Sequence, residues 1–161
     1  MGFVLVTVKF GKEDAAELEV LDCILPYDQT ARSVRQTYGG LLMLETSLDP
    51  DAAARIIMNT PTSLVRTIVP VDAVVGASIK EIVEKSTPLV GDTAKAIAVK
   101  CVRRGRSIRS SRDVEEEVGK TLKLSGHSIS LNSPDLVVRV DVIGEHATIS
   151  VRNPDLAFKK T

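Results

Sequence analysis

The sequence is poor in aromatic residues, which limits how the chain can hold another molecule. It has no tryptophan, two tyrosines and three phenylalanines among 161 residues. Proteins that bind single strands of nucleic acid often stack bases on exposed aromatic rings. None of the five aromatic residues lies in the most basic stretch of the chain, residues 93–112. Base stacking is therefore not expected there.

Residues that hold metals or perform nucleophilic chemistry are also scarce. Cys23 and Cys101 are far apart, form no Cys-x-x-Cys motif and lie in apolar patterns, so buried reduced thiols are expected instead of a disulfide or metal site. His127 and His146 are the only histidines and are too isolated for a metal cluster. The chain has no nucleophile elbow, P-loop or dinucleotide fingerprint. We expect no enzymatic activity, no metal and no cofactor.

Long apolar runs are missing as well. The longest apolar stretches, such as residues 3–8, have the length of a strand and fall short of the roughly 20 residues of a spanning helix. The amino terminus lacks the basic, apolar and small-residue regions of a secretory signal. These features predict a cytoplasmic location and no membrane partner.

The net charge of zero conceals an uneven distribution of 21 basic and 21 acidic residues. Residues 13–28 contain six acidic residues and no basic one. Residues 93–112, which we call the basic segment, contain seven basic residues and no acidic one. Such an asymmetry favours a localised anion-binding surface.

Periodic patterns divide the first half of the chain into short elements. Val4, Val6 and Val8 alternate with other residues, as in a half-buried strand. Gly39-Gly40 favours a hairpin, and Asp49-Pro50 is typical of a helix start. The patterns predict strands at 3–10, 32–37, 41–46 and 64–71 and helices at 15–25, 50–60 and, after Ser78, 79–85. This order predicts a ferredoxin-like subdomain with helices on one face of an antiparallel sheet.

Turn-forming residues at 87–92 mark the expected boundary between two subdomains. After it, an alternating strand at 97–102 leads into the basic residues, a helix begins near Ser110, and residues 136–143 and 147–151 form a closing hairpin. The predicted fold class is α+β: a ferredoxin-like subdomain at 1–88, an α/β domain at 89–155 and a tail at 156–161.

The basic segment is the sharpest candidate site, because a strand end, a glycine-containing loop and a helix amino terminus meet there. Free N–H groups at a helix start and forked guanidinium groups both suit phosphate oxygens. The candidate phosphate-contacting residues are Lys95, Lys100, Arg103, Arg104, Arg106, Arg109, Ser110, Ser111 and Arg112. The alternative is an ordinary solvated loop whose charges pair with Asp113 and with the glutamates at 115–117.

Three segments of this half resemble the THUMP domain: Ala98–Arg106, Ser110–Asp113 with Gly119, and Leu131–Val140. The resemblance covers about residues 90–152, and the preceding half resembles the ferredoxin-like subdomain that accompanies THUMP in tRNA-modifying proteins. Within the third segment, Pro134 and Asp135 either contact RNA or shape the turn into the next strand.

The resemblance implies binding of tRNA near its acceptor stem and 3′ end, so that a catalytic domain can act on a distant nucleotide. The chain is similar to stand-alone adaptors that guide a tRNA cytidine acetyltransferase. It would then be a non-catalytic tRNA-binding adaptor whose partners are tRNA and a separate tRNA-modifying enzyme. Two alternatives stay open: the RNA-binding subunit of a split thiouridine synthase, methyltransferase or pseudouridine synthase, or a protein–protein module without RNA.

Overall fold

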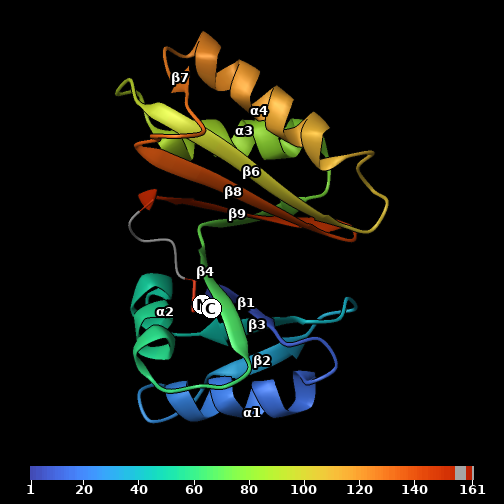
Figure 1. The fold of residues 1–161 in the computed structure, drawn as a ribbon, viewed down its shortest axis with the longest axis vertical. Coiled ribbons are helices and arrows are strands. Elements are labelled where there is room, and N and C mark those ends of the chain that lie inside the picture. Colours follow the sequence, from blue (N-terminus) through green and yellow to red (C-terminus); the bar gives the residue numbers. More distant parts are fainter. Residues whose placement is uncertain (155–158, 161) are drawn as a thin grey trace. The chain divides into compact units, whose positions relative to one another are not determined.

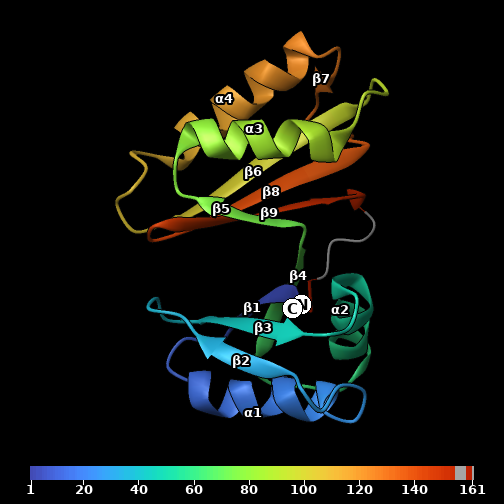
Figure 2. The ribbon, with the colours of Figure 1, turned by 180° about the vertical axis from the view of Figure 1, so that it is seen from behind.

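The computed structural model describes residues 1–154, 159 and 160. They form two compact units, each with its own core. The first contains residues 1–71 with 159 and 160, and the second contains residues 72–154. Figure 1 and Figure 2 show the elements of each unit from opposite sides. No helix in the described part of the chain is both long and apolar enough to span a membrane.

The first unit has a four-stranded antiparallel sheet in the order β2-β3-β1-β4. Two strand–helix–strand halves interleave so that β1 and β3 are central, which confirms the predicted ferredoxin-like arrangement. Its elements are β1 (Gly2–Val8), α1 (Glu13–Ile24), β2 (Arg32–Arg35), β3 (Leu41–Thr46), α2 (Pro50–Asn59) and β4 (Val65–Val71).

The core of the first unit lies between the sheet and both helices. The buried side chains Val4, Val6 and Val8 alternate along β1 and pack with α1 and α2 in one cluster. Helix α2 begins at the predicted cap, where the carboxylate of Asp49 accepts a hydrogen bond from the N–H of Ala52 at 3.2 Å.

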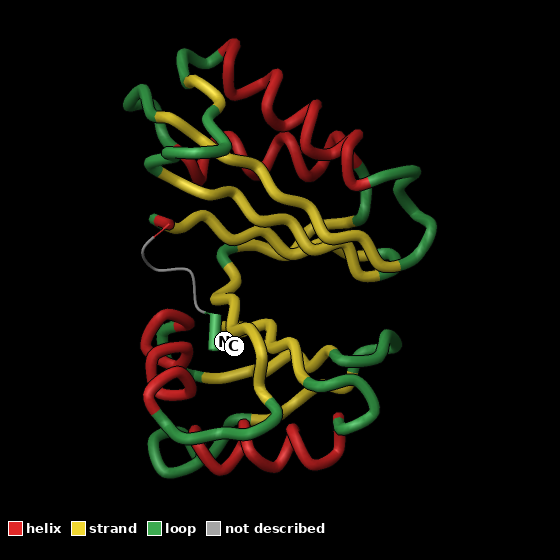
Figure 3. The backbone as a smooth tube through the Cα atoms, viewed as in Figure 1, coloured by secondary structure: helices red, strands yellow, loops and turns green. Residues whose placement is uncertain are grey.

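The second unit has a five-stranded mixed sheet in the order β5-β9-β8-β6-β7. Strand β6 is parallel to β7 and β8, while β8 and β9, and β9 and β5, are antiparallel. Helices α3 and α4 cover one face (Figure 3). Its elements are β5 (Ala73–Gly76), α3 (Ile79–Val90), β6 (Ala96–Arg104), α4 (Ser111–Leu124), β7 (Ser128–Ile129), β8 (Leu136–Ile143) and β9 (His146–Arg152).

The division between the units differs from the boundary expected after residue 88. The structure divides the chain between Val71 and Asp72, because β5 pairs with β9 and α3 packs on the second sheet. Helix α3 also continues through Pro88 to the buried side chain of Val90. The turn-forming residues at 87–92 therefore mark the end of a helix within the second unit.

The predicted tail lies partly outside the described residues, which exclude 155–158 and 161. Lys159 forms an antiparallel bridge with Thr67, next to the end of the chain. The N–H of Lys160 donates to the carbonyl oxygen of Arg66 at 2.8 Å, and its ammonium group donates to the hydroxyl of Thr62 at 2.7 Å. These two residues are thus held against β4.

Candidate nucleic-acid interface

The connection between β6 and α4, residues 105–110, brings most of the candidate residues to one end of the second sheet. Lys95 is not among them. It precedes the first residue of β6, whose nine residues span roughly 30 Å. Lys95 instead fixes the other end of the strand, where its N–H donates to Nδ1 of His127 at 3.2 Å.

The connection itself is held in one conformation by three features. Gly105 has a φ of 99°, which side chains of L-residues rarely adopt, so glycine suits the reversal after β6. The guanidinium group of Arg103 donates to the carbonyl oxygens of Gly105 at 2.8 Å and Ile108 at 3.2 Å. The side chain of Ile108 is buried in the core. Arg103 therefore shapes the loop, whatever else it contacts.

Helix α4 begins at Ser110, as the sequence predicts. The hydroxyl oxygen of Ser110 accepts a hydrogen bond from the N–H of Asp113 at 3.1 Å. A helix provides no acceptor for its first N–H groups, which here belong to Ser111 and Arg112. Backbone donors and the positive end of the helix dipole consequently face the basic loop.

The solvated-loop alternative is realised in part, because two arginines pair with acidic residues of α4. Arg109 makes two bonds to the carboxylate of Asp113, at 2.9 and 3.1 Å, and Arg112 lies 3.2 Å from Glu116. The bonded guanidinium group of Arg109 holds the pKa of Asp113 below its ordinary value. The side chains of Arg109 and Arg112 are 86% and 85% exposed. Exposed pairs of this kind stabilise a protein little, so phosphate can replace either carboxylate.

Lys100 and Arg106 are exposed and form no ion pair within the part of the chain that the structure describes. Arg106 projects from the connection between β6 and α4. Lys100 lies on β6 and, by strand alternation, on the face opposite α3 and α4. These two side chains keep their charge available for an anionic ligand.

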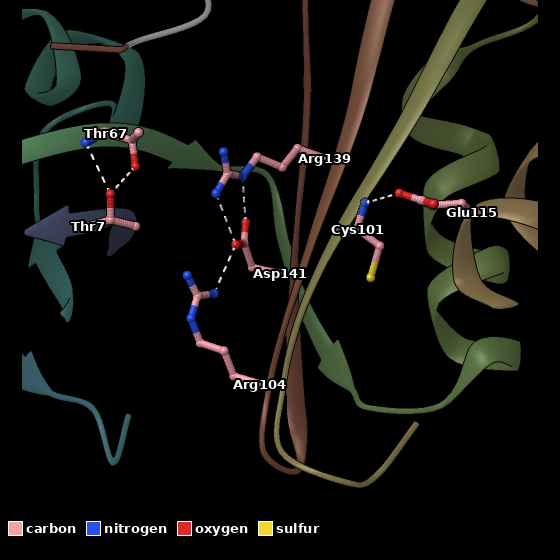
Figure 4. A network of polar contacts seen from close by, with 7 residues as sticks. All are labelled: Thr7, Thr67, Cys101, Arg104, Glu115, Arg139 and Asp141. Carbon is pink, nitrogen blue, oxygen red and sulfur yellow. Dashed lines mark hydrogen bonds and ion pairs between the residues drawn. The ribbon is translucent and has the colours of Figure 1, made fainter. Parts of the chain in front are cut away.

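Arg104 shares a buried carboxylate with a residue that sequence reasoning missed. It lies 3.2 Å from Asp141, and Arg139 makes bonds of 2.9 and 3.2 Å to the same carboxylate (Figure 4). The side chain of Asp141 is 1% exposed, and each arginine is 20% exposed. Two guanidinium groups around one carboxylate leave one positive charge in excess. The alternating pattern of β8 places Arg139 on the polar face of that strand. Its position beside Arg104 depends on the register of β6 and β8, which the local pattern does not give.

Residues 76–152 match the THUMP domain. The match begins at the end of β5, whereas the resemblance seen in the sequence begins near residue 90. The match is longer because β5 and α3 belong to the same unit as the later strands. A search among proteins of curated function found no match for this chain.

Solved structures share the fold over nearly the whole chain. A Pyrococcus horikoshii Ot3 protein, PH1313, has a TM-score of 0.72 and 16% identity, over 99% of this chain and 55% of that one. TrmN from Thermus thermophilus has a TM-score of 0.66 and 23% identity, over 94% and 45%. A 4-thiouridine synthetase, solved as an RNA complex with bound ATP, has a TM-score of 0.65 and 14% identity, over 94% and 41%. This chain thus spans about half or less of the length of each of these proteins. At sequence identities this low, the similarity shows a shared fold and no more.

The thiol of Cys101 in the THUMP domain has a raised pKa. Burial and the nearby charge of Glu115 raise the pKa of Cys101 to about 11, so the thiol is protonated at neutral pH. Glu115 also accepts a hydrogen bond from the N–H of Cys101 at 2.9 Å, which ties α4 to β6 (Figure 4). Both cysteines are free and buried, and their burial confirms this part of the prediction. Among the described residues, no group of three metal-ligand side chains comes together.

His127 and Asp135 organise the end of the THUMP domain opposite the basic loop. Nδ1 of His127 accepts a hydrogen bond, so Nε2 carries the proton and donates to the carbonyl oxygen of Gly91 at 3.0 Å. The carboxylate of Asp135 accepts from the N–H of Ala96 at 2.9 Å, and its own N–H donates to the carbonyl oxygen of Ala96 at 2.7 Å. Asp135 therefore shapes the turn into β8, which is one of its two predicted roles.

Proposed function

We propose that this chain is a non-catalytic tRNA-binding protein and that the β6–α4 connection of its THUMP domain holds RNA phosphates. THUMP domains bind tRNA in tRNA-modifying enzymes such as thiouridine synthases and methyltransferases. The observation that carries the proposal is the meeting of Arg106, Arg109 and Arg112 at the open amino terminus of α4. Phosphate contacts of this kind fix the position of an RNA without reading its bases.

We further propose that the chain is an adaptor, which presents tRNA to a separate modifying enzyme such as a tRNA cytidine acetyltransferase. Support for a binding role comes from the side chains that could react. The pKa values of the thiols of Cys23 and Cys101 are both raised by burial. The carboxylate of Asp141 is held between two arginines. Neither kind of group is poised as a nucleophile or a base.

A second candidate is the RNA-binding subunit of a split tRNA-modifying enzyme. It is favoured by the 4-thiouridine synthetase solved with RNA, in which the shared fold occupies 41% of a longer chain. Co-purification without tRNA separates the two proposals. An obligate catalytic partner forms a stable stoichiometric complex after nuclease treatment, whereas an adaptor meets its enzyme through tRNA or transiently.

The test of tRNA binding is an affinity measurement across a salt series. Contact with about four phosphates gives a slope near −3 for log affinity against log salt. The variant Arg106→Gln, Arg109→Gln and Arg112→Gln should lose roughly two units of slope together with affinity. We leave Arg103 and Arg104 unchanged, because their guanidinium groups hold the loop and Asp141.

The matched control removes three arginines of the first unit, Arg32, Arg55 and Arg66, each exposed. It lowers the net charge by the same amount and should lose less slope than the loop variant. Equal slopes in the natural chain and the loop variant would show that the β6–α4 connection does not hold the RNA.

A further inference from the structure

The outer side of α4 borders a largely apolar groove that shares Arg112 with the proposed tRNA site and otherwise lies outside it. The groove has a volume of about 640 Å³ and lies between α4, β7 and the residues that follow β7. Its apolar lining includes Val99, Gly119 and Ile129. Gly119 is buried on this side of α4, where it packs against Ile129. A Cβ at this position would lie 3.7 Å from Cδ1 of Ile129.

Two leucines beside the groove are almost fully exposed. Leu124 ends α4 with 82% of its surface accessible, and Leu131 follows β7 with 79% accessible. Leu18 in α1 of the first unit is also exposed, at 64%, but it does not line the groove. A cluster of apolar surface with a groove beside it marks a contact site more strongly than a single exposed leucine does.

The charges of α4 along this groove are self-complementary. Arg112, Glu115, Glu116, Gly119, Lys120 and Lys123 line it at spacings that place them on one helix face. Before Gly119, Arg112 pairs with Glu116 and Glu115 leaves one negative charge in excess, whereas the charged residues after Gly119, Lys120 and Lys123, are both basic. Lys120 and Lys123 form no ion pair within residues 1–154, 159 and 160. When two such helices pack antiparallel about a twofold axis, the acidic half of one faces the basic half of the other.

We propose that a second copy of this chain docks in the groove, with α4 against α4 in antiparallel orientation. A twofold contact requires a surface that is complementary to itself, which the charge pattern provides. In this arrangement Glu116 of one copy faces Lys123 of the other, and the exposed leucines cover the two grooves. The 14 residues of α4 extend for about 21 Å, so the buried surface is smaller than the roughly 800 Å² per partner of a standard interface. The dimer is accordingly weak and depends on concentration.

Sedimentation equilibrium of the full chain without tRNA tests this proposal. The average mass should rise from 17.4 kDa towards twice that value as the protein concentration increases. The variant Leu124→Glu with Leu131→Glu should stay at 17.4 kDa, and Leu18→Glu should behave like the natural chain. Circular dichroism verifies that each variant is folded. A natural chain that stays monomeric at every concentration would overturn the proposal.

A charge exchange tests the antiparallel orientation. Glu116→Lys and Lys123→Glu should each weaken the dimer about tenfold or more, because like charges then face each other. The double variant should recover the natural affinity, since the pair is restored with opposite polarity. A double variant as weak as the single ones would contradict this orientation. Loss of tRNA affinity in the leucine variants, with the natural chain monomeric, would instead assign the groove to RNA.

Discussion

Asp28 connects two segments of the first unit through a single carboxylate. It accepts hydrogen bonds from the hydroxyl and the N–H of Thr30, from the hydroxyl of Thr46 and from the N–H of Ser47, at 2.6 to 3.0 Å. Only 6% of Asp28 is exposed. The bond from the Thr30 hydroxyl, followed by that from Thr46, holds the pKa of Asp28 far below its ordinary value. The loop before β2 is thereby fastened to the end of β3.

This pKa shift predicts a pH-dependent contribution to stability. A depressed pKa in the folded state stabilises the protein fully above the unfolded value of 3.8, and the contribution is lost as the pH falls through the folded pKa. We expect Asp28→Asn to lower the thermal midpoint at neutral pH by several degrees. The difference from the natural chain should shrink below about pH 4. Thermal unfolding at several pH values measures it, with the exposed Asp22→Asn as control; a difference independent of pH would contradict it.

Ser110 allows the helix cap to be separated from the phosphate site. Ser110→Ala removes the acceptor for the N–H of Asp113 and should destabilise the chain by about 1 kcal/mol. Ser110→Asp keeps an acceptor and should fold as stably as the natural chain. It also adds a negative charge where phosphate is proposed to bind, so its tRNA affinity should fall. Denaturant titration and tRNA binding on the same samples decide this; unchanged affinity in Ser110→Asp would place the RNA elsewhere.

At the scale of elements, one arginine at the end of β6 holds the β6–α4 connection in shape, and another arginine within the connection is exposed. Arg103 is bonded to two carbonyl oxygens of the loop, whereas Arg106 is exposed. We expect Arg103→Gln to lower the free energy of unfolding by about 1 to 2 kcal/mol. Arg106→Gln should leave stability unchanged and reduce the salt slope of tRNA binding by just under one unit. Equal stability of the two variants would mean that the bonds of Arg103 do not hold the loop.

Elements with strong local signals were predictable from the sequence. The alternating valines of β1, the Asp49 cap of α2 and the Ser110 cap of α4 each depend on residues within a few positions of one another. The strands β5 and β7 were missed. They have four and two residues, and their pairing with β9 and β6 is what makes them strands. A sequence pattern of that length carries too little information to predict them.

The candidate site was predictable in composition and less so in geometry. The sequence places seven basic residues in 93–112, but the length of β6 separates Lys95 from the loop, and the pairs with Asp113 and Glu116 engage Arg109 and Arg112. The meeting of Arg104 and Arg139 at Asp141 requires the parallel register of β6 with β8, a contact between segments far apart in the chain. Such long-range pairings are fixed by the whole sheet and not by local patterns.

At the scale of the whole molecule, a net charge of zero conceals an acidic helix in one unit and a basic loop in the other. Helix α1 carries Glu13, Asp14, Glu17, Glu19 and Asp22 and no basic residue. The β6–α4 connection of the THUMP domain carries Arg106 and Arg109 and no acidic residue. Phosphates are repelled by the first surface and attracted by the second, so zero net charge is compatible with RNA binding.

Hydrogen exchange with and without tRNA tests whether RNA binds at the β6–α4 connection and not at α1. Protection should increase in residues 104–113, where the N–H groups at the start of α4 acquire phosphate partners, and should stay unchanged in α1. Because the contacts are electrostatic, the added protection should disappear as the salt concentration rises, together with the bound tRNA. Arg106→Gln, Arg109→Gln and Arg112→Gln together should abolish it at low salt, while Leu18→Glu should preserve it. Protection centred on α1 instead would show that the charge asymmetry does not orient the RNA.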